Sequence, residues 1–255
     1  MQKNDKYKEL ERYDKRIKNL ELKDYIYSES KVGSDQVDLI NKPIYKIYEK
    51  KLSEYINFND VVLEIGAGIG LHTFSILKEC KHLISTDISP ESINVLKAKF
   101  LENINFTAEI ADIENLPYKD NSFDVVCCAG SLSYGNNFIV FTEISRVLKK
   151  NGYFIMVDSL NENPIYKLNR FLHYVRGKRT LSTLKNMPNL KLFKIYKKKF
   201  KIEYLSFHGS IVWLVPLLRI FFKEDNISKI IHKFDNLTNI KRSAFKYISV
   251  LKKNK

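Results

Sequence analysis

Apolar side chains in the first 58 residues recur every three or four positions. Leu10, Tyr13 and Ile17 show this spacing, and so do the apolar residues that follow Pro43. A repeat of this period is typical of amphipathic helices, and the polar stretch SESKVGSD between the two groups indicates a loop. The sequence therefore predicts that the chain begins with helices.

From residue 59 to residue 158 the pattern changes to short apolar runs that alternate with helical segments. The runs are VVLEIG, HLISTD, INFTAEIAD, SFDVVCCAG and YFIMVD. Such alternation predicts parallel strands joined by crossover helices, and strands that are apolar on both faces, such as VVLEI and DVVCC, indicate a sheet covered on both sides. Ser89 and Pro90 suit the start of one helix, and Gly152 suits the end of another.

After residue 158 the pattern predicts a helix from Pro164 to about Arg176, a second helix over residues 190–198, and a strand, FKIEYLSF. Two apolar helical stretches and a last strand, FKYISVL, follow. The first of these helices is amphipathic, and its apolar face is expected to pack on the body of the protein. That face carries Ile165, Leu168, Phe171, Leu172 and Val175, and the opposite face carries Tyr166, Asn169, Arg170 and His173.

The first predicted strand runs into a glycine-rich turn, Glu64–Ile65–Gly66–Ala67–Gly68–Ile69–Gly70. Glycines at a strand-to-helix turn let a ligand approach the backbone closely. The dinucleotide fingerprint needs a third glycine or alanine where this chain has Leu71. The pattern E-x-G-x-G-x-G instead resembles the first motif of class I S-adenosylmethionine-dependent methyltransferases, and of the methyltransferase type 11 group in particular.

The resemblance continues along the chain. Asp87 ends the second predicted strand, where a carboxylate can accept from both ribose hydroxyls. Asp112 ends the third, where the family binds the adenine amino group and the next residue packs on the ring. The fourth strand leads into Gly130–Ser131–Leu132–Ser133–Tyr134, and a helix that ends in RVLKKNGYFIMVD follows. Five motifs thus occur in the family's order. The residues to which the resemblance assigns cofactor binding are Glu64, Gly66, Ala67, Gly68, Gly70, Asp87, Ile88, Asp112, Ile113 and Ser131.

The resemblance implies a Rossmann-like α/β fold. Its sheet has seven mostly parallel strands with the last antiparallel, and helical inserts follow strands five and six. Residues 1–58 would form a helical cap over the cofactor, which Tyr25 or Tyr27 could reach. Residues 59–158 would form the S-adenosylmethionine-binding core, and residues 159–255 would recognise the acceptor and complete the sheet.

The methyl acceptor is harder to predict. Methyltransferases of nucleic-acid amines resemble one another in an Asn/Asp-Pro-Pro-aromatic motif after the fourth strand, where this chain reads AGSLSY. Asn163–Pro164–Ile165–Tyr166 follows the fifth strand and lacks the second proline. No acidic cluster indicates a metal site. A looser similarity to methyltransferases of bacterial surface-polysaccharide gene clusters implies an O-methyl ether on a small or lipid-linked sugar. His173 would be the base or a substrate ligand, and Arg170 an anion anchor.

Charge adds two alternatives. Residues 159–255 hold 22 basic and 5 acidic residues, whereas the net charge of the whole chain is +14. A basic region with interleaved aromatic residues favours an RNA methyltransferase, although the abundance of Lys over Arg is also consistent with biased gene composition. The apolar run 211–222, flanked by lysines, favours peripheral contact with a membrane or a lipophilic acceptor such as a quinone.

Composition narrows the cellular setting. The chain is 44% hydrophobic and 28% charged, values that exclude wholesale disorder and coiled coil. Three cysteines without metal-ligand spacing, no apolar N-terminal stretch, and no run long enough to span a bilayer predict a cytoplasmic protein. Any membrane contact would then be peripheral, at the inner face.

Overall fold

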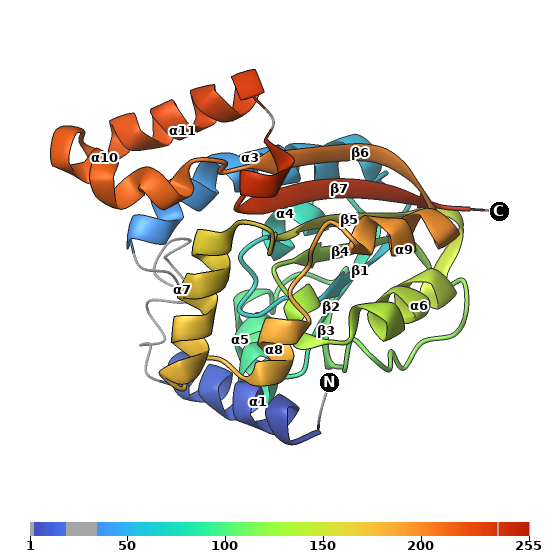
Figure 1. Ribbon diagram of the computed structural model, residues 1–255. Helices are drawn as coiled ribbons and strands as arrows, with labels where there is room; N and C mark the ends of the chain where they lie inside the picture. The colour runs from blue at the N-terminus through green and yellow to red at the C-terminus, as the bar shows by residue number, and fades with distance from the viewer. Residues whose placement is uncertain (1–2, 19–34, 239, 255) are drawn as a thin grey trace.

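A mixed sheet of seven strands lies at the centre of the part of the chain that the structure describes (Figure 1). This computed structural model describes residues 3–18, 35–238 and 240–254. The strands are β1 (Val61–Ile65), β2 (His82–Asp87), β3 (Phe106–Ile110), β4 (Phe123–Ala129), β5 (Leu148–Ser159), β6 (Phe200–His208) and β7 (Lys246–Lys253). Their order is β3-β2-β1-β4-β5-β7-β6, and β7 runs antiparallel to both of its neighbours. The expected seven-stranded, Rossmann-like sheet with an antiparallel last strand is confirmed.

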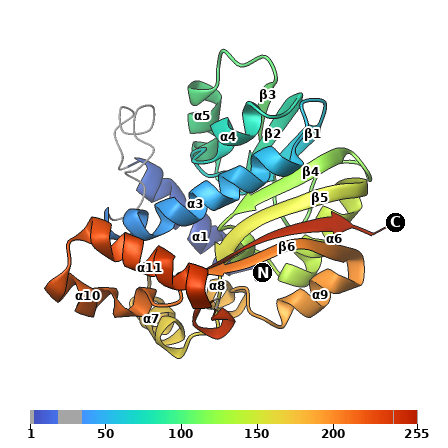
Figure 2. The ribbon, with the colours of Figure 1, turned by 90° about the horizontal axis from the view of Figure 1, so that it is seen from above.

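Helices cover both faces of the sheet (Figure 2). The helices are α1 (Lys3–Lys18), α3 (Asp35–Tyr55), α4 (Thr73–Leu77), α5 (Pro90–Lys99), α6 (Asn137–Val147), α7 (Pro164–Val175), α8 (Leu181–Lys185), α9 (Leu192–Lys199), α10 (Val215–Phe221) and α11 (Glu224–Thr238). Three short 3-10 turns are η1 (Leu132–Tyr134), η2 (Val212–Leu214) and η3 (Lys241–Ser243). The α7–α9 group lies between β5 and β6, and α10 and α11 lie between β6 and β7, as expected for inserts after strands five and six. None of the helices described is both long and apolar enough to cross a membrane.

The central strands carry apolar residues on both faces because successive side chains enter two different cores. On β4, Val126 and Cys128 pack against α6 and α9, whereas Val125 and Cys127 pack against α3, α4 and α5. Successive side chains of a strand point to opposite faces, so a sheet covered on both sides needs apolar residues throughout. The three cysteines are buried and free.

The expected role of Gly152 is wrong. Helix α6 ends at Val147, and Gly152 lies within β5. The left-handed backbone conformation expected at a helix end is found at the preceding residue, Asn151, whose φ is 64°. A Cβ atom on Gly152 would lie 2.7 Å from the carbonyl oxygen of Asp124, so close packing against the neighbouring strand requires the glycine.

The orientation expected for α7 is also wrong. Its apolar residues Leu168 and Val175 are 59% and 63% exposed, whereas Tyr166 and Arg170 on the opposite face are each only 6% exposed. Periodicity correctly predicted an amphipathic helix. It could not show that the polar face would find hydrogen-bond partners inside the protein and turn inward.

Candidate functional site

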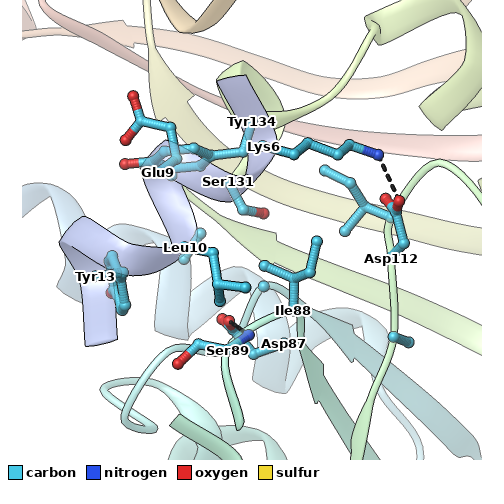
Figure 3. Close-up of a pocket in the computed structure, with 15 residues that line it drawn as sticks. Lys6, Glu9, Leu10, Tyr13, Asp87, Ile88, Ser89, Asp112, Ser131 and Tyr134 are labelled. Atoms are coloured by element: carbon cyan, nitrogen blue, oxygen red, sulfur yellow. Dashed lines mark hydrogen bonds and ion pairs between the residues drawn. The ribbon is translucent and has the colours of Figure 1, made fainter. Parts of the chain in front are cut away.

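A cavity of about 250 Å³ lies at the carboxyl ends of β1 to β4, beneath α1 (Figure 3). In this sheet order the chain leaves β1 in one direction and continues from β4 in the other, and open α/β sheets bind ligands at such a switch point. The residues that line the cavity are Lys6, Glu9, Leu10, Tyr13, Gly66, Asp87, Ile88, Ser89, Ala111, Asp112, Ile113, Ala129, Gly130, Ser131 and Tyr134.

Six of the ten predicted cofactor residues line this cavity, and they come from all four strand ends. They are Gly66, Asp87, Ile88, Asp112, Ile113 and Ser131. The other four, Glu64, Ala67, Gly68 and Gly70, are absent from the lining and shape the turn that surrounds it. The sequence motifs therefore identified the floor of the cavity.

Two glycines of the turn are required by close packing. Gly66 has φ 63°, and a Cβ atom there would lie 2.4 Å from Cβ of Ser131 at the end of β4. Gly70 has φ 83°, and a Cβ atom there would lie 2.8 Å from Leu96 of α5. The first glycine lets the ends of β1 and β4 meet, and the second lets the turn pack on α5.

Glu64 is a buried structural residue beneath the turn. Its Oε2 accepts hydrogen bonds from Thr73 Oγ1 at 2.7 Å and from Ser85 Oγ at 2.6 Å. These bonds join β1 to α4 and β2. Burial raises the pKa of the Glu64 carboxyl, although the two hydroxyl donors and the nearby His72 oppose that shift.

Asp87 holds the second strand end against the glycine turn. Its Oδ2 accepts from the backbone N–H of Gly68, and its Oδ1 accepts from that of Ser89, both at 2.9 Å. Burial raises the pKa of this carboxyl against the effect of those bonds. A carboxylate has about four acceptor positions, so Asp87 can accept from further donors in the cavity.

Asp112 makes an ion pair that the sequence did not reveal. Its carboxylate contacts Lys6 Nζ from α1 (Figure 3). Lys6 also contacts Glu114. Burial lowers the pKa of Lys6, but the hydrogen bonds to the two carboxylates outweigh burial and raise it overall. Asp112 also accepts from the backbone N–H of Glu114 at 2.9 Å.

Helix α1 forms the roof of the cavity. On the side of the sheet, Ser89 Oγ donates to Asp14. On the side of α8, Asp5 Oδ2 accepts from Ser182 N at 3.0 Å, and Glu9 Oε1 accepts from Thr180 N and from Thr183 Oγ1, both at 2.9 Å. These bonds hold the roof to the cofactor half and to the insert after β5. Figure 3 shows Leu10 of α1 facing Ile88 of the floor.

The second N-terminal helix has a different place from the one predicted. The residues of α3 are absent from the cavity lining, and Tyr48 and Leu52 of this helix pack against one face of the sheet. Of the two expected capping helices, α1 alone lines the cavity among the described residues. Tyr25 and Tyr27 lie outside the described residues.

The two residues predicted for catalysis lie on α7 and are absent from the cavity lining. Arg170 Nη1 donates to Leu160 O at 2.8 Å and to Asn161 Oδ1 at 2.9 Å, and it thereby fastens α7 to the end of β5. Burial, aided by Arg179, lowers the pKa of Arg170 to about 10. His173 is half-buried, and burial and neighbouring cations lower the pKa of its imidazole.

The Asn-Pro-x-aromatic sequence at the start of α7 forms a helix start. Asn163 Oδ1 caps α7 by accepting from Ile165 N at 2.8 Å, and Pro164 occupies the first turn. Tyr166 is buried and its hydroxyl donates to Gly209 O at 3.1 Å. These residues are therefore occupied in the fold.

Sequence reasoning missed the roof and the Tyr134 wall of the cavity. Leu10 and Tyr13 were identified as one face of a helix, but nothing in a single sequence places that helix over strand ends 50 to 120 residues away. Tyr134 follows the fourth strand in the predicted motif order, and that position was its one available signal. Burial raises the pKa of its phenol.

Groups of three or more potential metal ligands are absent from the described residues.

Comparison with known proteins is consistent with this geometry. Residues 63–156 match the methyltransferase domain family. An uncharacterized methyltransferase of Schizosaccharomyces pombe is 31% identical over 126 residues, 48% of this chain and 49% of the relative. The ubiquinone/menaquinone biosynthesis C-methyltransferase of Rickettsia prowazekii is 29% identical over 134 residues, 48% of this chain and 53% of the relative. The chain thus spans about half the length of these relatives.

The fold as a whole has solved counterparts. The geranyl diphosphate C-methyltransferase of Streptomyces coelicolor, solved with S-adenosyl-L-homocysteine, superposes with a TM-score of 0.63. The match covers 96% of this chain and 98% of that protein, at 11% sequence identity. At this level of sequence identity, the two proteins are similar in the arrangement of their helices and strands, and the comparison shows the fold alone.

Proposed function

We propose that this chain, whose residues 63–156 form a methyltransferase domain of class I, transfers the methyl group of S-adenosylmethionine to a hydroxyl of a small or lipid-linked sugar-type acceptor. The observation that most directly supports binding of S-adenosylmethionine is the Asp87 carboxylate beside the Gly66 turn, inside a cavity at the switch point of the sheet. Bound S-adenosylmethionine would supply an electrophilic methyl group on a sulfonium.

The floor of the cavity fits such a donor. Asp87 would accept from the ribose hydroxyls, and Ile88 and Ile113 would pack on the adenine. Asp112 would accept from the adenine amino group, which requires Lys6 to share or release that carboxylate. Gly66 and Ser131, at the ends of β1 and β4, would leave room for the methionine part.

The chain's own contribution to methyl transfer is to position the acceptor and exclude water. An in-line displacement gains mainly from orientation, and a covered cavity limits competing hydrolysis. Helix α1 provides the cover, and Glu9 and Tyr134 line the wall beneath it. An oxygen acceptor also needs a group that accepts its proton.

His173 stays our candidate for that base or for a substrate ligand. Its pKa lies below the ordinary value of 6.5, so the imidazole is neutral near pH 7 and can accept a proton. Arg170 is engaged with Leu160 and Asn161, so the anchoring role proposed for it would need an additional contact. Replacing His173 with alanine tests the role: turnover should fall without loss of S-adenosylhomocysteine affinity, and unchanged turnover would refute it.

A lipophilic acceptor such as a quinone is the second candidate. The curated relatives include a ubiquinone/menaquinone biosynthesis C-methyltransferase, and exposed apolar helices lie beside the basic insert. An RNA acceptor is a third, supported by the positive charge of residues 159–255 alone. With any of these acceptors we propose a cytoplasmic location, and the first two are compatible with contact at the inner membrane face.

Mass spectrometry of a strain that lacks the gene separates these acceptors. A glycolipid or sugar metabolite lighter by one methylene supports the main proposal, and a changed quinone or RNA nucleoside supports an alternative. Purified protein and labelled S-adenosylmethionine should restore the methyl group on the material from the deletion strain. An unchanged set of all four classes would contradict the proposed activity.

A further inference from the structure

Helix α7 presents its apolar face to the outside. Its residues Ile165, Leu168, Phe171, Leu172 and Val175 are all exposed. Within the part of the chain that the structure describes, nothing covers them. An exposed apolar stripe of this length on a strongly amphipathic helix is typical of a surface that binds something.

Hydrogen bonds on the opposite side of the helix fix this orientation. The Tyr166 hydroxyl accepts from Trp213 N at 3.1 Å and donates to Gly209 O, and Arg170 donates to Leu160 O. Rotating α7 to bury its apolar stripe would leave Gly209 O, Trp213 N and Leu160 O without these partners, and each unpaired buried group costs about 1–3 kcal/mol. The outward stripe is therefore built into the fold.

A second exposed apolar element lies next to the first. The bond from Trp213 to Tyr166 joins η2 to the start of α7, and α10 follows η2 directly (Figures 1 and 2). Its exposed apolar residues are Trp213, Leu217, Ile220, Phe221 and Phe222. We call the exposed apolar residues of α7, η2 and α10 together the apolar face.

The insert that carries α7 is strongly positive. Residues 160–199, between β5 and β6, include 11 basic residues and one acidic residue, and Lys167, Arg176 and Lys178 are exposed on or just after α7. The α10 side is more balanced, since Arg219 pairs with Glu224 at 3.1 Å. Positive charge thus accompanies the apolar face mainly through α7.

We propose that the apolar face docks on an anionic lipid bilayer, with the apolar residues of α7 and α10 at the headgroup boundary and the basic residues against the lipid phosphates. Apolar side chains flanked by lysine and arginine are the chemistry of interfacial helices. A second copy of this chain fits less well, because a symmetric interface would place two positive inserts together. This docking does not depend on the proposed methyl transfer.

Vesicle flotation tests the proposal. The wild-type chain should float with vesicles of phosphatidylcholine and phosphatidylglycerol, and salt should release it. The double variant Leu168→Glu with Phe221→Glu should lose about tenfold or more of the bound fraction, because two charges would have to enter the interface. Lys167→Glu should weaken binding to the anionic vesicles by about fivefold or more, since each basic residue near an anionic surface contributes to attraction.

A matched control exists near β3, at the other edge of the sheet from β6. Ile104, in the loop between α5 and β3, is 100% exposed, so Ile104→Glu makes the same kind of change away from the apolar face. It should float like the wild type. Each variant must be shown to be folded. A rise in the thermal midpoint with S-adenosylhomocysteine shows this if the cavity binds the cofactor. The circular dichroism spectrum and a cooperative melting transition show it whether or not the cofactor binds.

Four results would overturn the proposal. The first is a wild-type chain that does not float, and the second is equal flotation of the wild type and the Leu168→Glu, Phe221→Glu variant. The third is a wild-type dimer, seen by light scattering, that the same variant dissociates, because the face would then belong to a second copy. Equal binding to vesicles of phosphatidylcholine alone would refute the role of anionic lipid.

Discussion

Asp87 stabilises the glycine-rich turn and is also expected to bind the cofactor. Its carboxylate fastens Gly68 and Ser89, and it is the group that we expect to bind the ribose. Replacing Asp87 with alanine should weaken binding of S-adenosylhomocysteine by about tenfold or more, because hydrogen bonds to a charged group contribute roughly 1.5–3 kcal/mol. Isothermal titration calorimetry measures the loss. Asp120→Ala, at an exposed carboxylate away from the cavity, is the control and should bind normally.

Gly66 tests the close meeting of β1 and β4. An alanine there adds both left-handed strain and an overlap with Ser131, whereas alanine at Gly177 adds strain alone, since φ is 68° and no atom lies within 4 Å of its Cβ position. Chemical denaturation should show that Gly66→Ala lowers the free energy of unfolding more than Gly177→Ala does, by about 1–3 kcal/mol. Equal losses would mean that the meeting of the strands is not tight.

Glu64 gives a pH dependence. Burial raises the pKa of the Glu64 carboxyl above the ordinary 4.5. Between pH 4.5 and the folded-state pKa, the folded chain therefore holds a proton that the unfolded chain has released. The contribution of Glu64 to the free energy of unfolding is therefore complete below pH 4.5 and falls as pH rises through the folded-state pKa. In urea denaturation from pH 4 to pH 8, Glu64→Gln should remove this part of the decline. Parallel curves for the two proteins would contradict the assignment.

Among individual residues, the sequence identified those that belong to a family motif, but it did not identify the distant side chains that contact them. Gly66, Asp87 and Asp112 could be named because family spacing connects strand ends along the chain. Lys6 and Glu9 could not, because their partners Asp112 and Thr180 are brought near by folding alone. A lysine in a polar helix gives no local signal of a distant carboxylate.

Among the elements, α1 depends most on side-chain hydrogen bonds. Glu9 is buried and holds α1 to the start of α8, whereas Glu11 of the same helix is exposed. Glu9→Ala should increase amide hydrogen exchange in α1 and speed dissociation of S-adenosylhomocysteine several-fold, because a roof with fewer fastenings opens more often. Glu11→Ala is the matched control. Equal exchange in both variants would show that α1 is held in another way.

Helix α7 shows why an element can be predicted while its orientation is not. Spacing revealed two faces, and apolar residues usually turn inward. Here Tyr166 and Arg170 have backbone partners in the interior, and these decide the orientation. Those partners lie on other elements, so amphipathic spacing alone could not predict the outcome.

For the whole molecule, the alternation of strands and helices could be predicted from the apolar runs, and the seven-stranded sheet with its antiparallel last strand from the family resemblance. The acidic and basic residues are also divided between two parts of the structure. The cofactor half, residues 59–158, has 8 basic and 13 acidic residues, and the positive excess lies in the inserts and last strands. The position of α1 and the exposure of α7 and α10 depend on tertiary contacts, which such patterns do not encode.

The central claim is that the cavity under α1 binds S-adenosylmethionine, and titration of the purified chain with S-adenosylhomocysteine tests it most directly. The account predicts saturable one-to-one binding and a higher thermal midpoint, since a ligand of the folded state stabilises it. Asp87→Ala, still folded, should bind about tenfold or more weakly and show a smaller rise in the midpoint. A folded wild-type chain that gives no binding heat and no change in midpoint would contradict the account.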